Sequence, residues 1–489
     1  MQEVVNTISS LMWEPALVYV LLGTGLFFSI LTRFVQVRLF REMWRLIFSS
    51  KESARGISSF QALAVSLSGR VGTGNIAGVA AAIGVGGPGA VFWMWVVAFL
   101  GASTAYVEAA LGQIYKEEDE GQFRGGPAYY FEKALGQKWY AWIFAISTII
   151  AVGVLLPTVQ SNAIGAAVEL AFGGEAVLTT SLGTVSYTKL ITASVVVIFL
   201  GSIIFGGVKR IAHFTQIVVP VMAIGYIIMS MGIVIYHVDA LPGIIKMIFS
   251  DAFSPMAGLG AAIGWGVKRG VYSNEAGQGS GPHAASAAEV QHPAQQGLVQ
   301  AFSVYIDTLF VCSATAFMIL ITNQYYVADL DPTVSGGVLA TTIQANSPAF
   351  TQLAIQSVMG GFGKIFVAIA LFFFAFTTLL AYYYIAETNV AYIRRSFKFP
   401  GELTIIKFVL LGAVFYGTVR TADLAWGLGD IGLGVMAAVN VFGILILYFM
   451  GQPALIALKD YEEQHKAGVT EYTFDPKKLG IKNADFWEK

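Results

Sequence analysis

Long apolar stretches separated by shorter polar loops dominate the pattern of this chain. A helix needs about 20 mostly apolar residues to cross a bilayer core of about 30 Å. Eleven stretches are long enough, and their continuous apolar character differs from the alternating pattern of membrane β-barrel strands. They lie near residues 16–35, 59–84, 88–114, 140–172, 187–206, 211–237, 255–285, 294–323, 360–393, 402–420 and 425–450.

The composition supports a membrane protein. Of the 489 residues, 56% are hydrophobic and 12% are charged, whereas soluble domains carry about 25% charged residues. The mean hydropathy is +0.67. A net charge of −1 leaves no basic face for nucleic acid, and the single cysteine, Cys312, excludes an internal disulfide. The sequence therefore predicts an all-α polytopic membrane protein embedded in a lipid bilayer.

Lys and Arg gather in alternate loops, which predicts the orientation. The loops 36–58, 115–139 and 394–401 and the segment after residue 450 are the basic ones. We expect these to face the cytoplasm, with the N-terminus outside and the C-terminus inside. Residues 1–56 then form a first transmembrane helix plus a helix on the cytoplasmic membrane surface. Residues 451–489 form a polar cytoplasmic tail, which we expect to pack loosely.

Two of the predicted spans are interrupted. Residues 68–75 (SGRVGTGN) and 264–282 (GWGVKRGVYSNEAGQGSGP) combine several glycines with ionisable residues inside an apolar stretch. Each glycine weakens a helix by about 1 kcal/mol relative to alanine. Unpaired backbone groups at membrane depth are tolerated only where protein or a cavity satisfies them. The alternative is that the glycines only allow close helix packing.

The positions of the two interruptions predict a repeat. They fall in the second and seventh spans, so residues 57–254 and 255–450 form two units of five helices each. An odd number of helices gives the second unit the opposite orientation in the membrane. Inverted-repeat transporters have this arrangement, and their binding site lies at the midplane between two broken helices.

Several blocks of sequence resemble the alanine or glycine:cation symporter family. These are GRVGTGNIAGVAAAIGVGGPGAVFWMW from Gly69, GGPAYY from Gly125, RGVYSNEAGQGSG from Arg269, and Phe376-Thr377-Thr378. The resemblance runs from about residue 15 to 450. It implies a LeuT-type five-plus-five inverted repeat with broken helices 2 and 7 and about 11 transmembrane helices, and sodium-driven uptake of a small neutral amino acid, alanine or glycine, in the bacterial plasma (inner) membrane. Some bacterial carriers of this kind are linked to glutamine.

The two interruptions supply the candidate substrate site. Backbone N–H groups at the first break suit a carboxylate, whereas carbonyls around the second break, or the Glu275 carboxylate, suit an amine. Glu275 has a structural alternative, in which it holds the break through backbone N–H groups or pairs with Arg70 or Arg269. By resemblance, Gln160 and the Thr378–Tyr382 face line the pocket; the alternative for Gln160 is a hydrogen bond between helices. The family commonly has Trp at the position of Tyr382. The candidates are Gly72, Thr73, Gly74, Asn75, Gln160, Tyr272, Ser273, Glu275, Thr378 and Tyr382.

A sodium site is predicted beside the first break. Sodium suits uncharged oxygens, and by LeuT-type analogy the carbonyls of Ser68 and Val71 with the hydroxyls of Thr377 and Thr378 supply them. The alternative is that the two threonines bond back to the preceding turn of their own helix. We expect no organic cofactor. The remaining ionisable residues inside spans have no assigned role; they are Arg70, Glu108, Lys268, Arg269 and Asp307.

Other classes of membrane protein fit less well. A channel favours rings of symmetric subunits with repeated filters, whereas this chain has two unlike interruptions. The sequence has no cluster of catalytic residues of the kind that a membrane enzyme needs. A receptor or scaffold would have no need for polar residues inside its membrane spans. Proton coupling in place of sodium, the identity of the amino acid and the oligomeric state stay open at this point.

Overall fold

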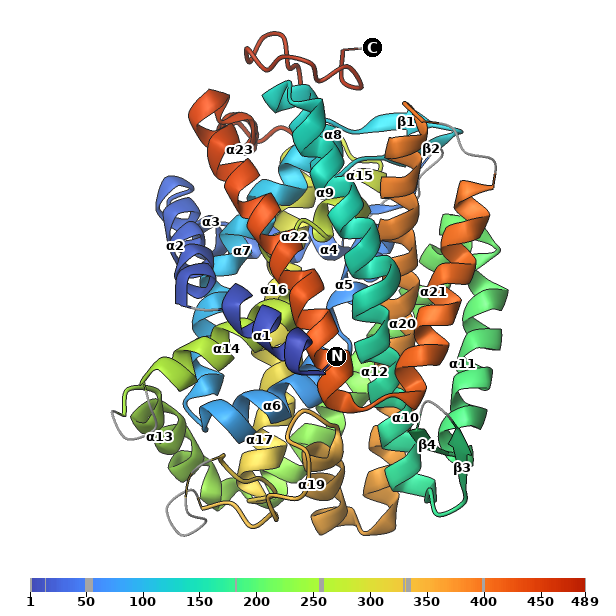
Figure 1. Ribbon diagram of the computed structural model, residues 1–489. Coiled ribbons are helices and arrows are strands. Elements are labelled where there is room, and N and C mark those ends of the chain that lie inside the picture. The colour runs from blue at the N-terminus through green and yellow to red at the C-terminus, as the bar shows by residue number, and fades with distance from the viewer. Residues whose placement is uncertain are drawn as a thin grey trace.

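The structure is a computed structural model that describes residues 2–13, 15–48, 56–180, 183–254, 259–328, 330, 336–397 and 401–488. Parts of two predicted basic loops (49–55 and 398–400) and the start of the predicted second repeat (255–258) lie outside the described residues. The described chain is a helical bundle with two short antiparallel hairpins (Figure 1). The hairpins are β1 (Glu117–Asp119) with β2 (Gln122–Arg124), and β3 (Val177–Thr180) with β4 (Gly183–Ser186). The all-α prediction is confirmed.

Nine helical stretches in the described part of the chain are long and apolar enough to cross a membrane. They coincide with nine of the eleven predicted spans. Two of them contain π-helical turns, which occur frequently at functional sites. In chain order the stretches are α1–α2 (Gln2–Met12, Pro15–Leu31), α7 (Ala90–Ile114), α9–η2–α10 (Lys138–Ile150, Ala151–Leu155, Leu156–Phe172), α11 (Tyr187–Ile204), α12 (Gly207–Tyr236), α16–η4–α17 (Pro293–Tyr305, Ile306–Cys312, Ser313–Ile321), α20 (Gly361–Arg394), α21 (Glu402–Val419) and α22 (Ala422–Gly451).

The other two predicted spans are split into shorter helices. The first is α5 (Ser59–Arg70), a 3₁₀ turn η1 (Thr73–Asn75) and α6 (Ala77–Gly86). The second is α14 (Leu259–Asn274) followed by α15 (Gly281–Ala287). Left-handed backbone at Glu275, with φ of 58°, and at the two glycines Gly277 and Gly279 ends α14, because this conformation cannot continue a right-handed helix.

The split helices lie inside the bundle rather than at its edge. Helix α7 packs against α14, α15 and α16, and α20 packs against α5, α10 and α12 (Figure 1). All side chains from Ala62 to Ile83 are buried. The interruptions are therefore shielded by protein, which is the condition for non-helical backbone at membrane depth.

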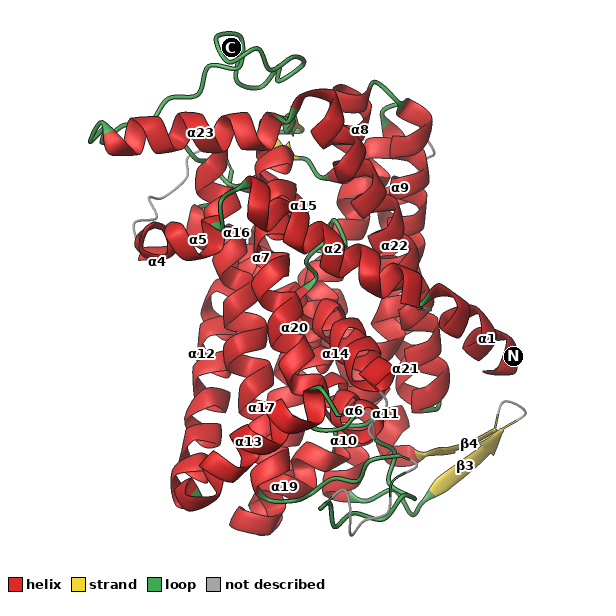
Figure 2. Cartoon of the chain, turned by 90° about the vertical axis from the view of Figure 1, so that its left-hand side faces the viewer, coloured by secondary structure: helices red, strands yellow, loops and turns green. Residues whose placement is uncertain are grey.

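The remaining elements gather at the two ends of the bundle (Figure 2). The end that carries β1–β2, α8 (Pro127–Leu135) and α23 (Pro453–Lys466) is called the tail side below. The opposite end carries α13 (Leu241–Ala252), α19 (Ala349–Met359), the 3₁₀ turn η3 (Val238–Ala240) and β3–β4. The predicted surface helix appears as α3 (Val35–Arg38) and α4 (Phe40–Phe48), whose apolar residues Met43 and Leu46 are buried while Trp44 and Phe48 are exposed.

The C-terminal tail packs tightly, so the prediction of a loose tail is wrong. Helix α23 buries Ala457, Leu458 and Tyr461, and beyond it Ile481 and Ala484 are also buried. The overall polarity of this segment concealed a sparse set of apolar and aromatic residues, each of which finds a place on the tail side.

Candidate functional site

The first break brings backbone amides next to side chains of other helices. The Gly72 N–H donates to Asn75 Oδ1 at 2.8 Å within the break. The Thr73 N–H donates to Gln160 Oε1 of α10 at 3.0 Å. Gln160 also lies beside the phenol groups of Tyr272 and Tyr382. Six predicted substrate residues, from the first break, α10, α14 and α20, are therefore neighbours in space.

Two glycines of this break are required by close packing. A Cβ at Gly74 would lie 3.1 Å from both the Ser273 Cα and the Tyr272 ring of α14. A Cβ at Gly72 would meet Gln160 Oε1 at 3.0 Å and would collide with the Thr378 hydroxyl. The glycines thus let the first break touch α14 on one side and α20 on the other.

The predicted sodium residues are partly together. The Thr378 hydroxyl lies between two acceptors, the Ser68 carbonyl at the end of α5 at 2.8 Å and the Phe374 carbonyl one turn back on α20 at 2.9 Å. The Thr377 hydroxyl donates to the Phe373 carbonyl at 2.9 Å, one turn back on its own helix, and lies 3.8 Å from the sulfur of Met222 in α12. Thr378 therefore faces the first break and Thr377 faces α12.

A buried carboxylate links both breaks. Asp307, in the π-helical turn η4, accepts hydrogen bonds from Asn75 Nδ2 at 2.7 Å and from the Ser273 hydroxyl at 3.0 Å. Thr308 donates to its second oxygen at 2.7 Å, and the Cys312 sulfur lies 3.3 Å from Asn75 Nδ2. Asn75 and Ser273, both predicted substrate residues, thus meet on a carboxylate to which the sequence assigns no role.

The second break is held by Glu108 of α7. Its carboxylate accepts the N–H groups of Gly277 at 3.1 Å and Gly279 at 2.9 Å. Asn440 of α22 donates to the same carboxylate and to the Gly277 carbonyl. Tyr130 donates in turn to Asn440 Oδ1 at 2.8 Å. This network fixes the backbone between α14 and α15 to three other helices.

Glu275 lies within the second break and accepts a hydrogen bond from Ser280 at 2.8 Å. Its carboxylate faces Gly69 of α5, where an added Cβ would lie 3.2 Å away. Arg70 donates to the Gln300 carbonyl at 3.1 Å and to Ser303. The contact with Ser280 favours a structural role for Glu275 in the turn between α14 and α15. The two arginines considered as its partners bond elsewhere in the described chain, Arg269 to Asp430 and Arg70 to Gln300 and Ser303.

An ion-pair cluster joins α14 to α22 just before the second break. Asp430 of α22 pairs with Arg269 through two contacts of 2.9 and 3.2 Å and with Lys268 at 2.7 Å. The Arg269 guanidinium stacks 4.2 Å from the Trp426 ring, and Trp426 in turn packs 4.9 Å from the Tyr272 ring. Tyr272 is a predicted substrate residue, so this cluster lies directly beside the candidate pocket.

The sequence indicated some of these added residues but not their partners. Glu108, Asp307, Lys268 and Arg269 were marked as ionisable residues inside spans, a class that usually marks a pathway. Asp430 lies in the eleventh span and carried the same signal, yet it was not singled out. Pairings such as Glu108 with Gly277, which are 169 residues apart, have no sequence signal.

The comparison with protein families decides the identity of this architecture. The model of the sodium:alanine symporter family matches residues 1–476. The chain belongs to the sodium:alanine symporter family. Its members and their relatives are transporters, so the prediction that the chain is not an enzyme is confirmed.

Relatives in this family align over nearly their whole length. YrbD of Bacillus subtilis is 56% identical over 100% of this chain and 98% of its own. The sodium/proton-dependent alanine carrier protein of Bacillus sp. strain PS3 is 48% identical over 91% of this chain and 97% of its own. The sodium/alanine symporter AgcS of Methanococcus maripaludis is 38% identical over 91% and 94%.

A solved structure supports the fold. The crystal structure of MhsT in complex with L-phenylalanine has a TM-score of 0.55 and 15% sequence identity, over 82% of this chain and 97% of that chain. At this identity the match concerns the fold alone. It confirms the predicted LeuT-type architecture of a multi-pass membrane protein.

Proposed function

We propose that this protein is a secondary active transporter that couples sodium entry to uptake of alanine by alternating access. The observation that carries the proposal is the meeting of both interrupted helices around one polar centre. Asn75 of the first break and Ser273 at the end of α14 bond the same carboxylate oxygen. Family membership and relatives named as alanine carriers support the choice of ion and substrate.

The substrate carboxylate is proposed to bind the amides of Gly72, Thr73 and Gly74. In the structure the Thr73 N–H is held by Gln160 Oε1 at 3.0 Å. An incoming carboxylate replaces that oxygen, which frees Gln160 to accept a proton donor of the substrate. Because one acceptor replaces another, no buried amide is left unpaired. An unpaired buried amide would cost about 1–3 kcal/mol.

The substrate amine is proposed to face the second break. Its acceptors are carbonyl oxygens near Tyr272 and Ser273, at the end of α14, where the helix leaves carbonyls without intrahelical partners. Alanine has a small side chain, and the close approach of Gly74 to Tyr272 leaves little room beyond it. Packing around the breaks therefore favours a small amino acid.

Sodium is proposed to bind between α5 and α20. The Thr378 hydroxyl already contacts the Ser68 carbonyl at 2.8 Å, so a cation at this place would take both oxygens as ligands. The Val71 carbonyl is proposed as a third ligand. Thr377 would have to turn its hydroxyl away from the Phe373 carbonyl and from Met222 of α12 to join this set. Because the site joins a split helix to α20, ion binding would favour the conformation in which the two helices are together, which couples ion and substrate.

The ion-pair cluster around Asp430 is proposed to act as the outer gate. Arg269 and Lys268 belong to α14 and Asp430 belongs to α22. Opening the pocket toward the outside requires these helices to separate, which breaks the ion pairs. The contact between the Trp426 and Tyr272 rings supports a closure next to the proposed substrate site.

We propose a bacterial inner-membrane location with the tail side in the cytoplasm and the N-terminus outside. The excess of Lys and Arg in the loops on that side supports this orientation. The test uses single cysteines at exposed Glu120 or Lys138 in a Cys312→Ser background. An impermeant thiol reagent added outside the cells should leave them unlabelled, and labelling from outside would reverse the orientation.

Glutamine transport and proton coupling are the alternatives within the same fold. GlnT of Bacillus subtilis, described as a probable sodium/glutamine symporter, is 38% identical over 96% of this chain and 92% of its own. Tyr382 in place of the family's Trp frees volume and adds a hydroxyl beside Gln160, which favours a larger polar substrate. For a proton, the buried carboxylate of Asp307 is the group that touches both breaks.

The proposal is tested by binding to the purified protein. Labelled alanine should bind in sodium buffer and lose most of its affinity when choline replaces sodium at constant pH and ionic strength. Unlabelled glutamine and a change of pH in choline buffer test the two alternatives. Alanine binding that is equally strong without sodium would contradict sodium coupling at this site.

A further inference from the structure

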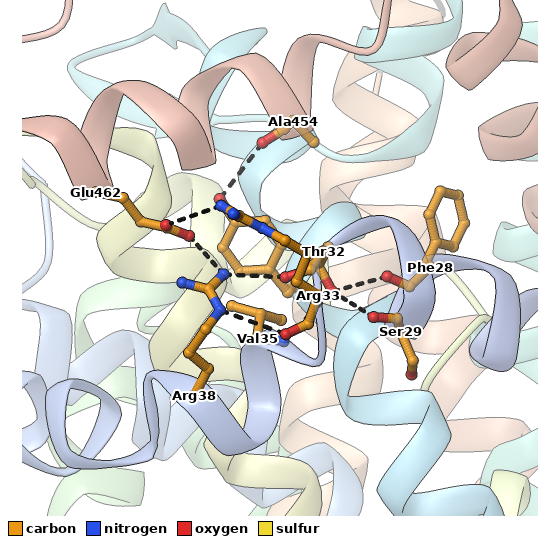
Figure 3. A network of polar contacts seen from close by, with 9 residues as sticks. Phe28, Ser29, Thr32, Arg33, Val35, Arg38, Ala454 and Glu462 are labelled. Carbon is orange, nitrogen blue, oxygen red and sulfur yellow. Dashed lines mark hydrogen bonds and ion pairs between the residues drawn. The ribbon is translucent and has the colours of Figure 1, made fainter.

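The tail helix α23 is fixed to the tail side by charged contacts. Glu462 accepts hydrogen bonds from Arg38 at 2.7 Å and from Arg33 at 3.4 Å, at the turn that follows α2 (Figure 3). Tyr106 of α7 also donates to the Ala454 carbonyl of this helix. The Glu462 side chain is only 6% exposed, so its contacts lie between α23 and the rest of the bundle and hold this helix in place.

Beyond α23 the chain crosses the tail side in steps. Tyr472 stacks on Tyr461 with ring centroids 4.5 Å apart. Asn483 then donates to the Lys133 carbonyl at 2.8 Å, and Asp485 pairs with the Lys133 ammonium at 3.0 Å. These contacts lead the last described residues to the end of α7.

Two aromatic rings of the tail cover a buried lysine. The Lys116 ammonium lies 4.4 Å from the Phe486 ring centroid and 5.3 Å from that of Trp487, and the side chain is only 1% exposed. Burial lowers the pKa of Lys116 to about 7. The Trp487 indole N–H donates to the Gln113 carbonyl at 2.9 Å. The tail therefore shields the Lys116 side-chain nitrogen from water and holds the last turn of α7.

Gln113 in the last turn of α7 and Lys116 just beyond this helix hold the end of α15. Gln113 and Lys116 donate to the Ala288 carbonyl at 2.9 and 2.8 Å, just past the end of α15. The Glu289 N–H donates to the Ile57 carbonyl at 3.0 Å, and the Ile57 N–H donates to the Ala287 carbonyl at 3.1 Å. Because Ile57 precedes α5, these bonds join the start of α5 to the end of α15.

We propose that Phe486 and Trp487 form an inner clasp that, through Gln113 and Lys116, positions α5 and α15 in the closed arrangement toward the cytoplasm. The proposal rests on the transport function and orientation proposed above, because release of substrate inward requires these half-helices to separate. Trp487, Gln113 and Lys116 are positioning residues: they lie at the tail side, away from the substrate candidates, and act through the helix ends.

Hydrogen exchange of the full chain in lipid nanodiscs tests the clasp. The amides of Ile57 and Glu289 report directly on the joint between the half-helices. In Phe486→Ala/Trp487→Ala these amides should exchange at least about fivefold faster, the effect of one ordinary hydrogen bond on an equilibrium. The single variant Trp487→Phe keeps both rings over Lys116, so the amides of Ile57 and Glu289 should keep most of the protection that they have in the parent protein.

Trp139→Ala serves as the matched control. This ring is 62% exposed and its indole bonds only the neighbouring Gln137 side chain, so the exchange at Ile57 and Glu289 should stay as in the parent. Unchanged exchange at these amides in the double variant would overturn the clasp, as would faster exchange spread evenly through α16 and α20. The exchange experiment uses no substrate, so its outcome does not depend on whether the protein transports alanine. Failure of the proposed transport function and failure of the clasp can therefore be told apart.

Discussion

Replacing Asp430 by asparagine should destabilise the protein strongly, because one carboxylate is the ion-pair partner of two buried basic side chains. Arg269 approaches it at 2.9 Å and Lys268 at 2.7 Å. The side chains of Asp430, Arg269 and Lys268 are 4%, 2% and 12% exposed. Removing one partner of a buried ion pair costs about 3–5 kcal/mol, since it leaves an uncompensated charge. In Asp430→Asn both cations lose their partner, so we expect a loss in this range.

Two further variants turn this into an ordered prediction. Arg269→Met leaves Lys268 paired with Asp430, so no charge is orphaned and the loss should be smaller. Asp423→Asn, on the same helix, changes an exposed carboxylate bonded to Asn346 at 2.8 Å, and should cost about 0.5–1.5 kcal/mol at most. The assay is the midpoint of thermal or denaturant unfolding in one detergent. Equal losses for Asp430→Asn and Asp423→Asn would refute the reasoning.

Three further predictions concern the proposed site. Thr378→Ala should raise the sodium concentration for half-maximal alanine uptake by about tenfold, roughly 1.4 kcal/mol, whereas Thr378→Ser, which keeps the hydroxyl, should not; an unchanged sodium dependence in Thr378→Ala would move the site elsewhere. Gly72→Ala places a Cβ against Gln160 and Thr378, which should destabilise the local packing by about 1–3 kcal/mol and strongly reduce alanine uptake. Gly78→Ala, with its nearest neighbour at 3.7 Å, should stay active; equal activity of the two variants would contradict the packing argument. If glutamine competes with labelled alanine, Tyr382→Trp should weaken that competition at least about tenfold, and competition that survives the change would make Tyr382 a packing residue only.

The overall architecture was predictable because it depends on properties that the sequence displays directly. Apolar length predicted the nine long helical stretches. Glycine and ionisable residues within the stretches 68–75 and 264–282 predicted where the other two would be interrupted. The spacing of those interruptions predicted an inverted repeat, because such a repeat requires matched positions in two halves. The resemblance to the symporter family implied its LeuT-type form.

Side-chain pairing was not predictable in the same way. Glu108 holds Gly277 across 169 residues of sequence, and Arg269 pairs with Asp430 across 161. No periodicity connects such positions. The π-helical turn that presents Asp307 to Asn75 and Ser273 has no glycine or proline to announce it. Such contacts follow from how the helices pack, which a single sequence does not encode locally.

The tail shows why average polarity misled the prediction. Residues 451–489 contain many charged residues, but packing depends on which residues are placed where. Tyr461, Phe486 and Trp487 are isolated in sequence or at its very end, and each meets a partner from a distant segment. A window average assigns them no weight, whereas in the structure they hold the tail in place.

Reconstitution into proteoliposomes tests the central claim most directly. An inward sodium gradient should drive labelled alanine to an internal concentration above that outside, and sodium ionophore should abolish the accumulation. The predicted result is accumulation with sodium that is absent with an equal choline gradient and that is largely lost in Gly72→Ala. Equal alanine entry with sodium and choline gradients, or mere equilibration, would contradict sodium-coupled transport by this protein.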